Sequence, residues 1–177
     1  YRPDHSPAGA DYERAIGLIN SAKRPVILAG HGIILSGATE LVKRFAEKAH
    51  IPIAMTLLGI GSIPASHPLN LGMMGMHGES WVNTAIQEAD LLLAFGMRFD
   101  DRVTGNLKNY APNAKKIHVE IDPAEINKNV KVDLALVGDI GAVAERLAAK
   151  LEAAKANNNK DEWLESCVAK KQEWAIY

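Results

Sequence analysis

The sequence predicts an α/β fold in which a parallel sheet of five or six strands carries helices on both of its faces. Two observations lead to this prediction. Short, continuous apolar runs alternate along the chain with longer segments whose apolar residues recur at i, i+3, i+4 and i+7. The apolar runs are bounded by glycine, proline and polar residues, which is typical of strands buried on both faces. Because strands and amphipathic helices alternate, helical crossovers join the strands and the sheet is parallel.

The first half of the chain contains two predicted strands and two predicted helices. Asp11 is placed to cap the first helix, since a carboxylate can accept the free N–H groups of a first turn. Strands are predicted at residues 26–29 and 51–56, on either side of a helix at 38–50. The connection 57–78 has no regular period, and loops of this length in a compact domain are usually functional. The inward face of the first helix consists of Tyr12, Ala15, Ile16 and Ile19.

The second half of the chain continues the alternation. A second irregular stretch, 97–114, lies between two of its strands. Asp122 and Pro123 predict the start of a further helix, with the aspartate at the cap and the proline in the first turn. Five strands are recognisable in all, and a sixth can lie in a loop. In this half, helices are predicted at 79–89 and 140–154, and strands from Leu91, at 116–121 and at 134–137.

The chain divides into three predicted parts. Residues 1–10, rich in proline, glycine and polar groups, form an extended amino-terminal linker, and residues 11–155 form the α/β domain. Residues 156–177 form a polar break followed by a helical connector toward a missing C-terminal domain. In that connector, we expect Trp163 and Trp174 to be partly exposed.

Composition excludes several classes of function. The chain has 177 residues, of which 20 are basic and 21 acidic, and its formal charge is −1. The protein therefore has no large net positive charge that would attract nucleic acid or an anionic membrane. The single Cys167 excludes an internal disulfide and fits a reducing compartment. The six histidines do not cluster at ligand spacing, so no metal site is expected, and His118 is interpreted as structural. No Gly-x-Ser-x-Gly motif supports a hydrolase.

The segment after the Leu91 strand is the strongest candidate for a binding site. Ligands of open α/β sheets lie beyond the carboxyl ends of the strands. Here Gly96 would let a ligand approach the backbone, and Arg98 and Arg102 could neutralise a buried pyrophosphate, with Asp100 orienting one of them. The alternative, a solvated loop whose charges pair with one another, is equally consistent with the spacing.

Glycines mark two further candidate turns. Gly30-His31-Gly32 resembles the opening of a dinucleotide fingerprint, but Leu35 stands where the third glycine belongs, which argues against a plain NAD site. The turn still suits a helix amino end that faces a phosphate. Gly75-Met76-His77-Gly78 places a methionine and a potential donor between two glycines, although Met73, Met74 and Met76, taken alone, would more often fill the core.

Polar side chains at other predicted strand ends complete the set of candidates. Thr56 and Leu57 follow the second strand, where a hydroxyl and an amide could meet a cofactor, or where the strand simply ends. Glu120 ends the fourth recognisable strand, where a carboxylate can bind the hydroxyls of a ribose. Asp139, beyond the fifth, is similarly placed, although a helix cap is the commoner role for an aspartate there.

Six ordered motifs carry a family resemblance. Arg-Phe-Asp-Asp-Arg-Val-Thr-Gly at 98–105 resembles the signature of the central domain of biosynthetic acetolactate synthase (acetohydroxyacid synthase). The similarity runs from about residue 1 to about residue 151. The other motifs are Gly30-His31-Gly32, Thr56-Leu57-Leu58-Gly59-Ile60-Gly61, Gly75-Met76-His77-Gly78, the segment 117–126 and Val137-Gly138-Asp139.

The resemblance implies a Rossmann-like central domain of a thiamine-diphosphate enzyme, and it implies that this domain binds FAD. In that family two other domains bind thiamine diphosphate and Mg²⁺ at a subunit interface. This chain lacks the Gly-Asp-Gly and distant Asn-Asn of those domains, so it is expected to have no catalytic residue and no activity alone. The implied FAD-binding residues are Gly30, His31, Gly32, Thr56, Leu57, Gly75, Met76, His77, Gly96, Arg98, Asp100, Arg102, Val103, Glu120, Ile121, Gly138 and Asp139.

The resemblance also implies the context of the chain. The parent enzyme would decarboxylate pyruvate and add the two-carbon unit to a second pyruvate or to 2-oxobutyrate, in branched-chain amino acid biosynthesis. Its partners would be the N- and C-terminal thiamine-diphosphate-binding domains, in a cytoplasmic homodimer or homotetramer, with or without a regulatory subunit. Neither nucleic acid nor a membrane is expected as a partner.

Three alternatives remain open on the sequence. The first is the central domain of another thiamine-diphosphate enzyme, such as glyoxylate carboligase or the FAD-free catabolic acetolactate synthase; the intact motif at 98–105 argues against the catabolic type. The second is a non-catalytic nucleotide-binding or oligomerisation module. A dehydrogenase is the third, and the broken glycine fingerprint argues against it.

Overall fold

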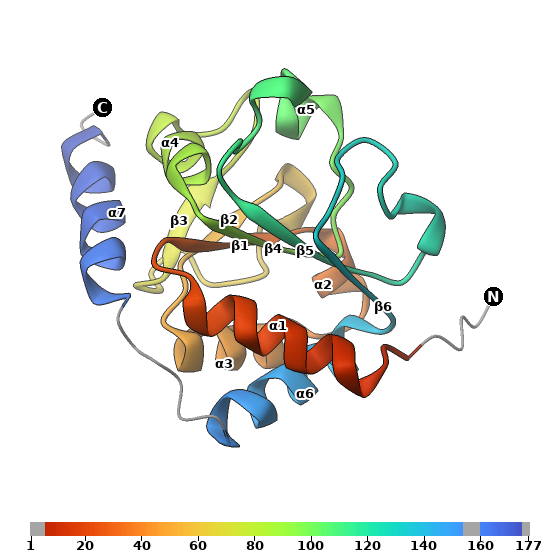
Figure 1. Cartoon of the computed structure of the whole chain (residues 1–177). Coiled ribbons are helices and arrows are strands. Elements are labelled where there is room, and N and C mark those ends of the chain that lie inside the picture. The colour runs from red at the N-terminus through yellow and green to blue at the C-terminus, as the bar shows by residue number, and fades with distance from the viewer. Residues whose placement is uncertain (1–5, 154–159, 175–177) are drawn as a thin grey trace.

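A computed structural model describes residues 6–153 and 160–174 (Figure 1). Its strands are β1 (Pro25–Ala29), β2 (Ile53–Met55), β3 (Asn70–Met73), β4 (Leu91–Phe95), β5 (Lys115–Glu120) and β6 (Leu134–Val137). Its helices are α1 (Gly9–Ser21), α2 (His31–Leu35), α3 (Thr39–Ala49), α4 (Ser80–Glu88), α5 (Asp101–Thr104), α6 (Ile140–Ala153) and α7 (Asp161–Trp174). Single 3₁₀ turns are η1 (Leu57–Gly59), η2 (Leu107–Asn109) and η3 (Pro123–Glu125).

The strands of the described residues form one parallel sheet in the order β3-β2-β1-β4-β5-β6, which confirms the predicted α/β fold. From β1 at the centre of the sheet, β2 and β3 follow in order toward one edge. The chain then returns to the centre, and β4, β5 and β6 follow in order toward the other edge. β1 and β4 are therefore neighbours whose connections leave in opposite directions. Such a reversal opens a crevice beyond the carboxyl ends of the two central strands.

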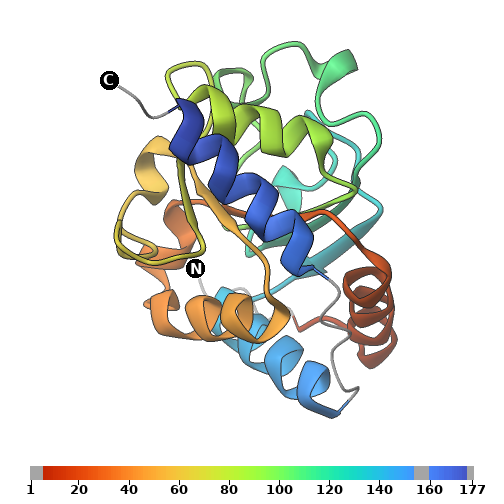
Figure 2. The same ribbon diagram turned by 90° about the vertical axis from the view of Figure 1, so that its left-hand side faces the viewer.

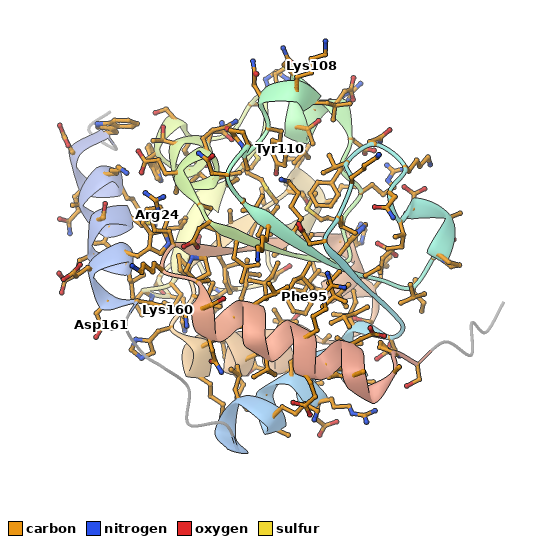
Figure 3. The ribbon with its side chains drawn as sticks, viewed as in Figure 1. Arg24, Phe95, Lys108, Tyr110, Lys160 and Asp161 are labelled. Carbon is orange, nitrogen blue, oxygen red and sulfur yellow. The ribbon has the colours of Figure 1, made fainter. Side chains whose placement is uncertain are left out.

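The faces of the sheet explain the continuous apolar runs. Side chains alternate along a strand, so Ile27 and Ala29 of β1 join the core with α1, α3 and α6, while Val26 and Leu28 face α4 and α7. Figure 1 shows α1, α3 and α6 on one side of the sheet and α4 on the other. Because helices cover both faces, every residue of β1 is buried. Phe95 and Tyr110 lie on opposite faces (Figure 3).

The sixth strand, β3, lies within the connection 57–78. Its sequence Asn70-Leu71-Gly72-Met73 has one buried aliphatic side chain and a glycine at φ +117°, so it lacks the apolar run that marks β1, β2, β4 and β6. It pairs on one side with β2, with a shift in register between Ile53 and Ala54.

Two predicted helix starts are corrected by the structure. Helix α1 begins at Gly9, after Ala8, so Asp11 lies in the first turn and is not the cap. Asp122 does cap, since its carboxylate accepts the N–H of Ala124 at 2.9 Å, but the helix after it is the single turn η3. No helix among the described residues has the length and apolar composition needed to cross a bilayer.

The carboxyl-terminal helix α7 packs on the sheet domain, contrary to the expected exposure of Trp163. Figure 2 shows α7 lying along α4. The Trp163 side chain is buried, and its indole N–H donates to the carbonyl of Pro25 at 3.0 Å. Trp174 is 43% exposed, as predicted. Of the polar break predicted at 157–161, residues 157–159 lie outside the described residues, and Asp161 begins α7. The three-part division of the chain stays a prediction.

Lys160 precedes α7 and is buried near the carboxylate of Asp90 (Figure 3). Burial lowers the pKa of Lys160, and the charge of Asp90 opposes that shift. Asp90 also accepts the backbone N–H groups of Lys23 and Arg24 at 2.8 and 2.9 Å. The start of α7 is thus anchored electrostatically beside the entry into β1 and β4.

Candidate functional site

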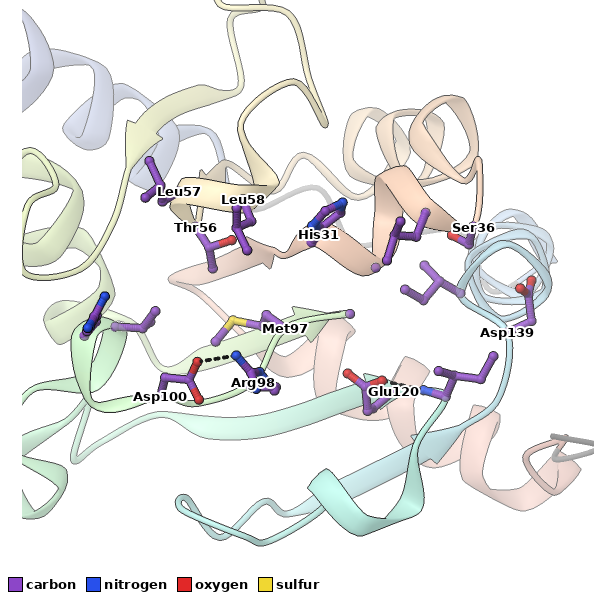
Figure 4. A pocket seen from close by; sticks show the side chains of 17 residues that line it. His31, Ser36, Thr56, Leu57, Leu58, Met97, Arg98, Asp100, Glu120 and Asp139 are labelled. Carbon is purple, nitrogen blue, oxygen red and sulfur yellow. Dashed lines mark hydrogen bonds and ion pairs between the residues drawn. The ribbon is translucent and has the colours of Figure 1, made fainter. Parts of the chain in front are cut away.

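A cleft of about 770 Å³ lies beyond the carboxyl ends of β1 and β4, at the reversal of the sheet (Figure 4). Both its position and its volume are usual for a small-molecule site in an α/β fold. Its lining residues are His31, Gly32, Leu35, Ser36, Thr56, Leu57, Leu58, Gly96, Met97, Arg98, Asp100, Arg102, Val103, Glu120, Ile121, Asp139 and Ile140.

The cleft brings together most of the residues that the sequence predicted for a site. Gly30 and Gly138 are each one residue away from the lining, and the turn 75–78 lies outside it. That these residues bind a cofactor stays a prediction. The predicted residues that line the cleft are His31, Gly32, Thr56, Leu57, Gly96, Arg98, Asp100, Arg102, Val103, Glu120, Ile121 and Asp139.

The floor of the cleft is formed by the turns after β1 and β4, which touch through their glycines. The N–H of Gly30 donates to Phe95 at 2.9 Å, and that of Gly32 donates to the carbonyl of Gly96 at 3.0 Å. A Cβ on Gly30 would lie 2.2 Å from the Gly96 oxygen. These glycines are required by contact between two backbones. The Gly32 N–H is therefore bonded within the protein, and binding of a phosphate at the amino end of α2 stays a prediction.

One wall of the cleft is charged and follows β4. The guanidinium of Arg98 pairs with the carboxylate of Asp100 at 3.0 Å, which is the orienting contact that the sequence predicted (Figure 4). Both side chains remain substantially exposed, at 61% and 40%. Arg102 is exposed beside the cleft, and its guanidinium has no carboxylate partner among the described residues. This wall therefore offers positive charge to an anion.

Glu120 ends β5 at the edge of the same wall. Its side chain is only 11% exposed, and one carboxylate oxygen accepts the N–H groups of Ile121 at 2.9 Å and Asp122 at 3.3 Å. Burial raises the pKa of Glu120, and the two backbone N–H groups act against that shift. The second carboxylate oxygen retains lone pairs that can accept from a ligand hydroxyl.

His118 supports the charged wall from below. Its Nε2–H donates to the carbonyl of Met97 at 2.9 Å, and its ring packs edge-on against Phe99 with centroids 5.1 Å apart. Burial lowers the pKa of His118, although the bond to Met97 and the charge of Glu125 oppose the shift. A neutral, buried ring of this kind agrees with the structural role interpreted from the sequence.

The opposite wall is apolar and comes from α2 and η1. Leu35, Leu57 and Leu58 are 77%, 69% and 63% exposed, although each is a large aliphatic side chain. Figure 4 shows Leu57, Leu58 and His31 across the cleft from Arg98 and Glu120. Sequence reasoning missed five lining residues: Leu35, Ser36, Leu58, Met97 and Ile140. Leu58, Met97 and Ile140 carried a signal, because each directly follows a candidate residue in the sequence.

Two predicted polar residues also have internal roles. The hydroxyl oxygen of Thr56 accepts the N–H of Gly59 at 3.0 Å and so caps η1. The carboxylate of Asp139 accepts the N–H of Ala142 at 2.9 Å in the first turn of α6, as a helix cap does. Both side chains line the cleft as well, so the two interpretations of each are compatible.

The turn 75–78 borders the cleft without lining it. The N–H of Met76 donates to the carbonyl of Arg102 at 2.8 Å, and the Met76 side chain is 68% exposed. Met74, by contrast, is buried in the core. The interpretation of these methionines as core filler thus holds for Met74 and is wrong for Met76. Among the described residues, no group of three His, Cys, Asp or Glu side chains could hold a metal ion.

Comparison with known proteins places the chain in a family. Residues 12–147 match the family model described as thiamine pyrophosphate enzyme, central domain. The chain is 48% identical over 165 residues to a probable acetolactate synthase large subunit of Methanocaldococcus jannaschii, covering 93% of this chain and 28% of that protein. It is 45% identical to the acetolactate synthase large subunit of Corynebacterium glutamicum, with 93% and 26% covered. The chain thus spans under a third of the length of these relatives.

Proposed function

The chain belongs to the thiamine pyrophosphate enzyme family, whose central domain it matches, and from this premise we propose that its cleft binds FAD within an acetolactate synthase. The family resemblance seen in the sequence is confirmed. FAD and the activity of the whole enzyme are our proposal.

The observation that carries the proposal is that a charged wall with two arginines faces an apolar wall across one cleft. FAD has two ring systems and a ribose joined through a pyrophosphate, so it needs positive charge in the middle and apolar contact at its ends. Arg98 and Arg102 would hold the pyrophosphate, and Glu120 would accept from the ribose hydroxyls. One of the two ring systems would lie against Leu57 and Leu58.

The relatives' names support a carboligation reaction for the whole protein. Two pyruvates, or pyruvate and 2-oxobutyrate, would condense with loss of CO₂ on thiamine diphosphate bound with Mg²⁺ outside this chain. The atoms balance without an oxidant, so FAD supplies no net electron transfer and its proposed role is structural. The chain alone is then inactive, and the parent serves branched-chain amino acid biosynthesis.

The same proposal names partners and location. The N- and C-terminal thiamine-diphosphate-binding domains would complete the enzyme in a homodimer or homotetramer, and the words "large subunit" in the relatives' names are consistent with a regulatory subunit. The cytoplasm is the proposed compartment. Cys167 is compatible with it, because its thiol is buried and burial raises its pKa to about 12.

An FAD titration of the 177-residue chain tests the proposal, with flavin fluorescence and thermal shift as readouts. We expect saturable binding that Arg98→Ala weakens and that NAD does not compete away. Absence of binding by this chain and by the longer protein that contains it would refute FAD as the ligand. Binding by the longer protein alone would show that neighbouring domains complete the site.

A further inference from the structure

Asn83 lies outside the cleft, on α4, and its side chain forms two hydrogen bonds with the backbone of Gly75. Its amide oxygen accepts the N–H of Gly75 at 2.9 Å, and its amide N–H donates to the carbonyl of the same residue at 2.9 Å. The planar side-chain amide of Asn83 thus binds both the N–H and the carbonyl of Gly75. No other side chain among the described residues makes such a paired contact with the turn 75–78.

The same end of α4 fixes the strand that leads into this turn. The carboxylate of Glu79 accepts the N–H of Met73 at 2.5 Å, and the indole N–H of Trp81 donates to the carbonyl of Leu71 at 2.8 Å. Asn83 completes this series of contacts along the chain. Helix α4 therefore determines where β3 ends and where the following turn lies (Figure 1).

The turn 75–78 contacts α5, the short helix that contains Arg102. The N–H of Met76 donates to the carbonyl of Arg102 at 2.8 Å. Gly75 has φ +98°, and a Cβ there would lie 2.7 Å from that same carbonyl oxygen. The two backbones are in van der Waals contact as well as hydrogen-bonded, so displacement of the turn is transmitted to Arg102.

The other hydrogen bonds of α5 are local. The N–H groups of Val103 and Thr104 donate to the carbonyl of Asp100, and that of Gly105 donates to Asp101. Within the described ranges, the bond from Met76 is the one that ties α5 to a distant part of the chain. The Arg102 guanidinium has no carboxylate partner among the described residues. The position of this side chain therefore depends on the backbone of α5.

We propose that Asn83 is a positioning residue for the ligand in the cleft, acting through the turn 75–78 on Arg102. The proposal rests on the proposed function, because the anion that Arg102 meets is taken to be the pyrophosphate of FAD. Asn83 itself does not touch the ligand. It fixes the register between the turn and α5, and so fixes the point from which the Arg102 side chain reaches into the cleft.

Amide hydrogen exchange by NMR tests the contact chain without any ligand. Asn83→Ala should accelerate exchange of the Met76 N–H at least severalfold, because the turn loses both bonds to the helix, while β4 amides remain protected. Gln87→Ala is the matched control. Gln87 lies one turn further along α4, and its side-chain oxygen accepts the N–H of Ala111 at 2.9 Å, far from the turn. It should leave Met76 exchange unchanged.

FAD affinity tests the consequence at the cleft. Asn83→Ala should raise the Kd by roughly tenfold, as coupled neighbours of a binding group do, whereas Gln87→Ala should not. In the Arg102→Ala background, Asn83→Ala should add less than about twofold, because its effect passes through Arg102. A variant that merely loosened the fold would instead add its full effect in both backgrounds.

Two results would overturn the proposal: unchanged Met76 exchange in folded Asn83→Ala, or full additivity with Arg102→Ala. Should Asn83→Ala not fold, Asn83→Asp replaces it, since the carboxylate keeps the bond from the Gly75 N–H and loses the donor to its carbonyl. If the unaltered chain binds no FAD, the proposed function fails for this chain, and the exchange experiment still decides whether Asn83 positions α5.

Discussion

The two walls of the cleft differ in the chemistry of the side chains that they present. The wall formed by α2 and η1 presents aliphatic side chains, with Leu57 and Leu58 more than half exposed. The wall after β4 presents Arg98 and Arg102, and distant segments support its backbone. His118 donates to Met97, and Asn129 donates to Phe99 at 3.1 Å.

The difference follows from what each wall can offer a ligand. Apolar contact has no direction, so exposed leucines can bind a ring without being held at a fixed angle. Charged hydrogen bonds depend on distance and angle, so arginines need a backbone held in place. A ligand that fits both walls needs an apolar ring for one and an anionic group for the other. FAD has both.

The largest expected effect is at the floor where the two walls meet. Gly30→Ala places a Cβ 2.2 Å from the carbonyl oxygen of Gly96, so the turns after β1 and β4 must separate. We expect the free energy of unfolding to fall by about 3 kcal/mol, measured by urea denaturation. Gly17→Ala is the control: nothing lies within 4 Å of its Cβ, and alanine in α1 should stabilise by about 0.5–1 kcal/mol. Equal stability of Gly30→Ala and the unaltered chain would contradict the described contact.

Arg102→Ala tests the charged wall. Loss of one charged hydrogen bond to the pyrophosphate should weaken FAD binding by about 1.5–3 kcal/mol, measured by fluorescence titration. Because the Arg102 side chain is exposed, the loss should shrink as salt is raised. Unchanged affinity at low salt would remove Arg102 from the site.

Leu58→Ala tests the apolar wall in the same titration. Removal of part of an exposed aliphatic surface should weaken FAD binding by about 1–1.5 kcal/mol. Unlike the effect of Arg102→Ala, this loss should not depend on salt, because it involves no charge. A salt-dependent loss of affinity would contradict the proposal that a ring of FAD contacts the apolar wall and that its pyrophosphate contacts the charged wall.

The smallest expected effect concerns the support of the charged wall. Burial holds the pKa of His118 below its ordinary value of 6.5, so below that pH the unfolded chain binds a proton that the folded chain does not. Stability should therefore fall with pH from 6.5 downward, by a fraction of the roughly 1.4 kcal/mol per pH unit that one full proton would give. His118→Gln can still donate to Met97 and should flatten this slope. An identical slope in the variant would show that His118 does not contribute it.

The sequence was sufficient for the elements whose pattern is local. Continuous apolar runs marked β1, β2, β4 and β6, whereas β5 was recognised by its alternating apolar residues Ile117 and Val119. In β3, Gly72 and a polar first residue break the run. Likewise, the charged segment 98–102 and Glu120 were found because they directly follow buried strands. Leu35 and Ser36 were missed because they line the cleft only through the bend after α2.

The sequence by itself therefore determined the fold class, the family and most of the residues that gather at the cleft. Only the tertiary structure decided which segments touch. It buries Trp163 against Pro25, brings Gly30 onto Gly96, and links Asn83 through the turn 75–78 to Arg102. The reason is physical: periodicity reports which face of an element is apolar, whereas contacts between distant segments depend on how helices pack on the sheet.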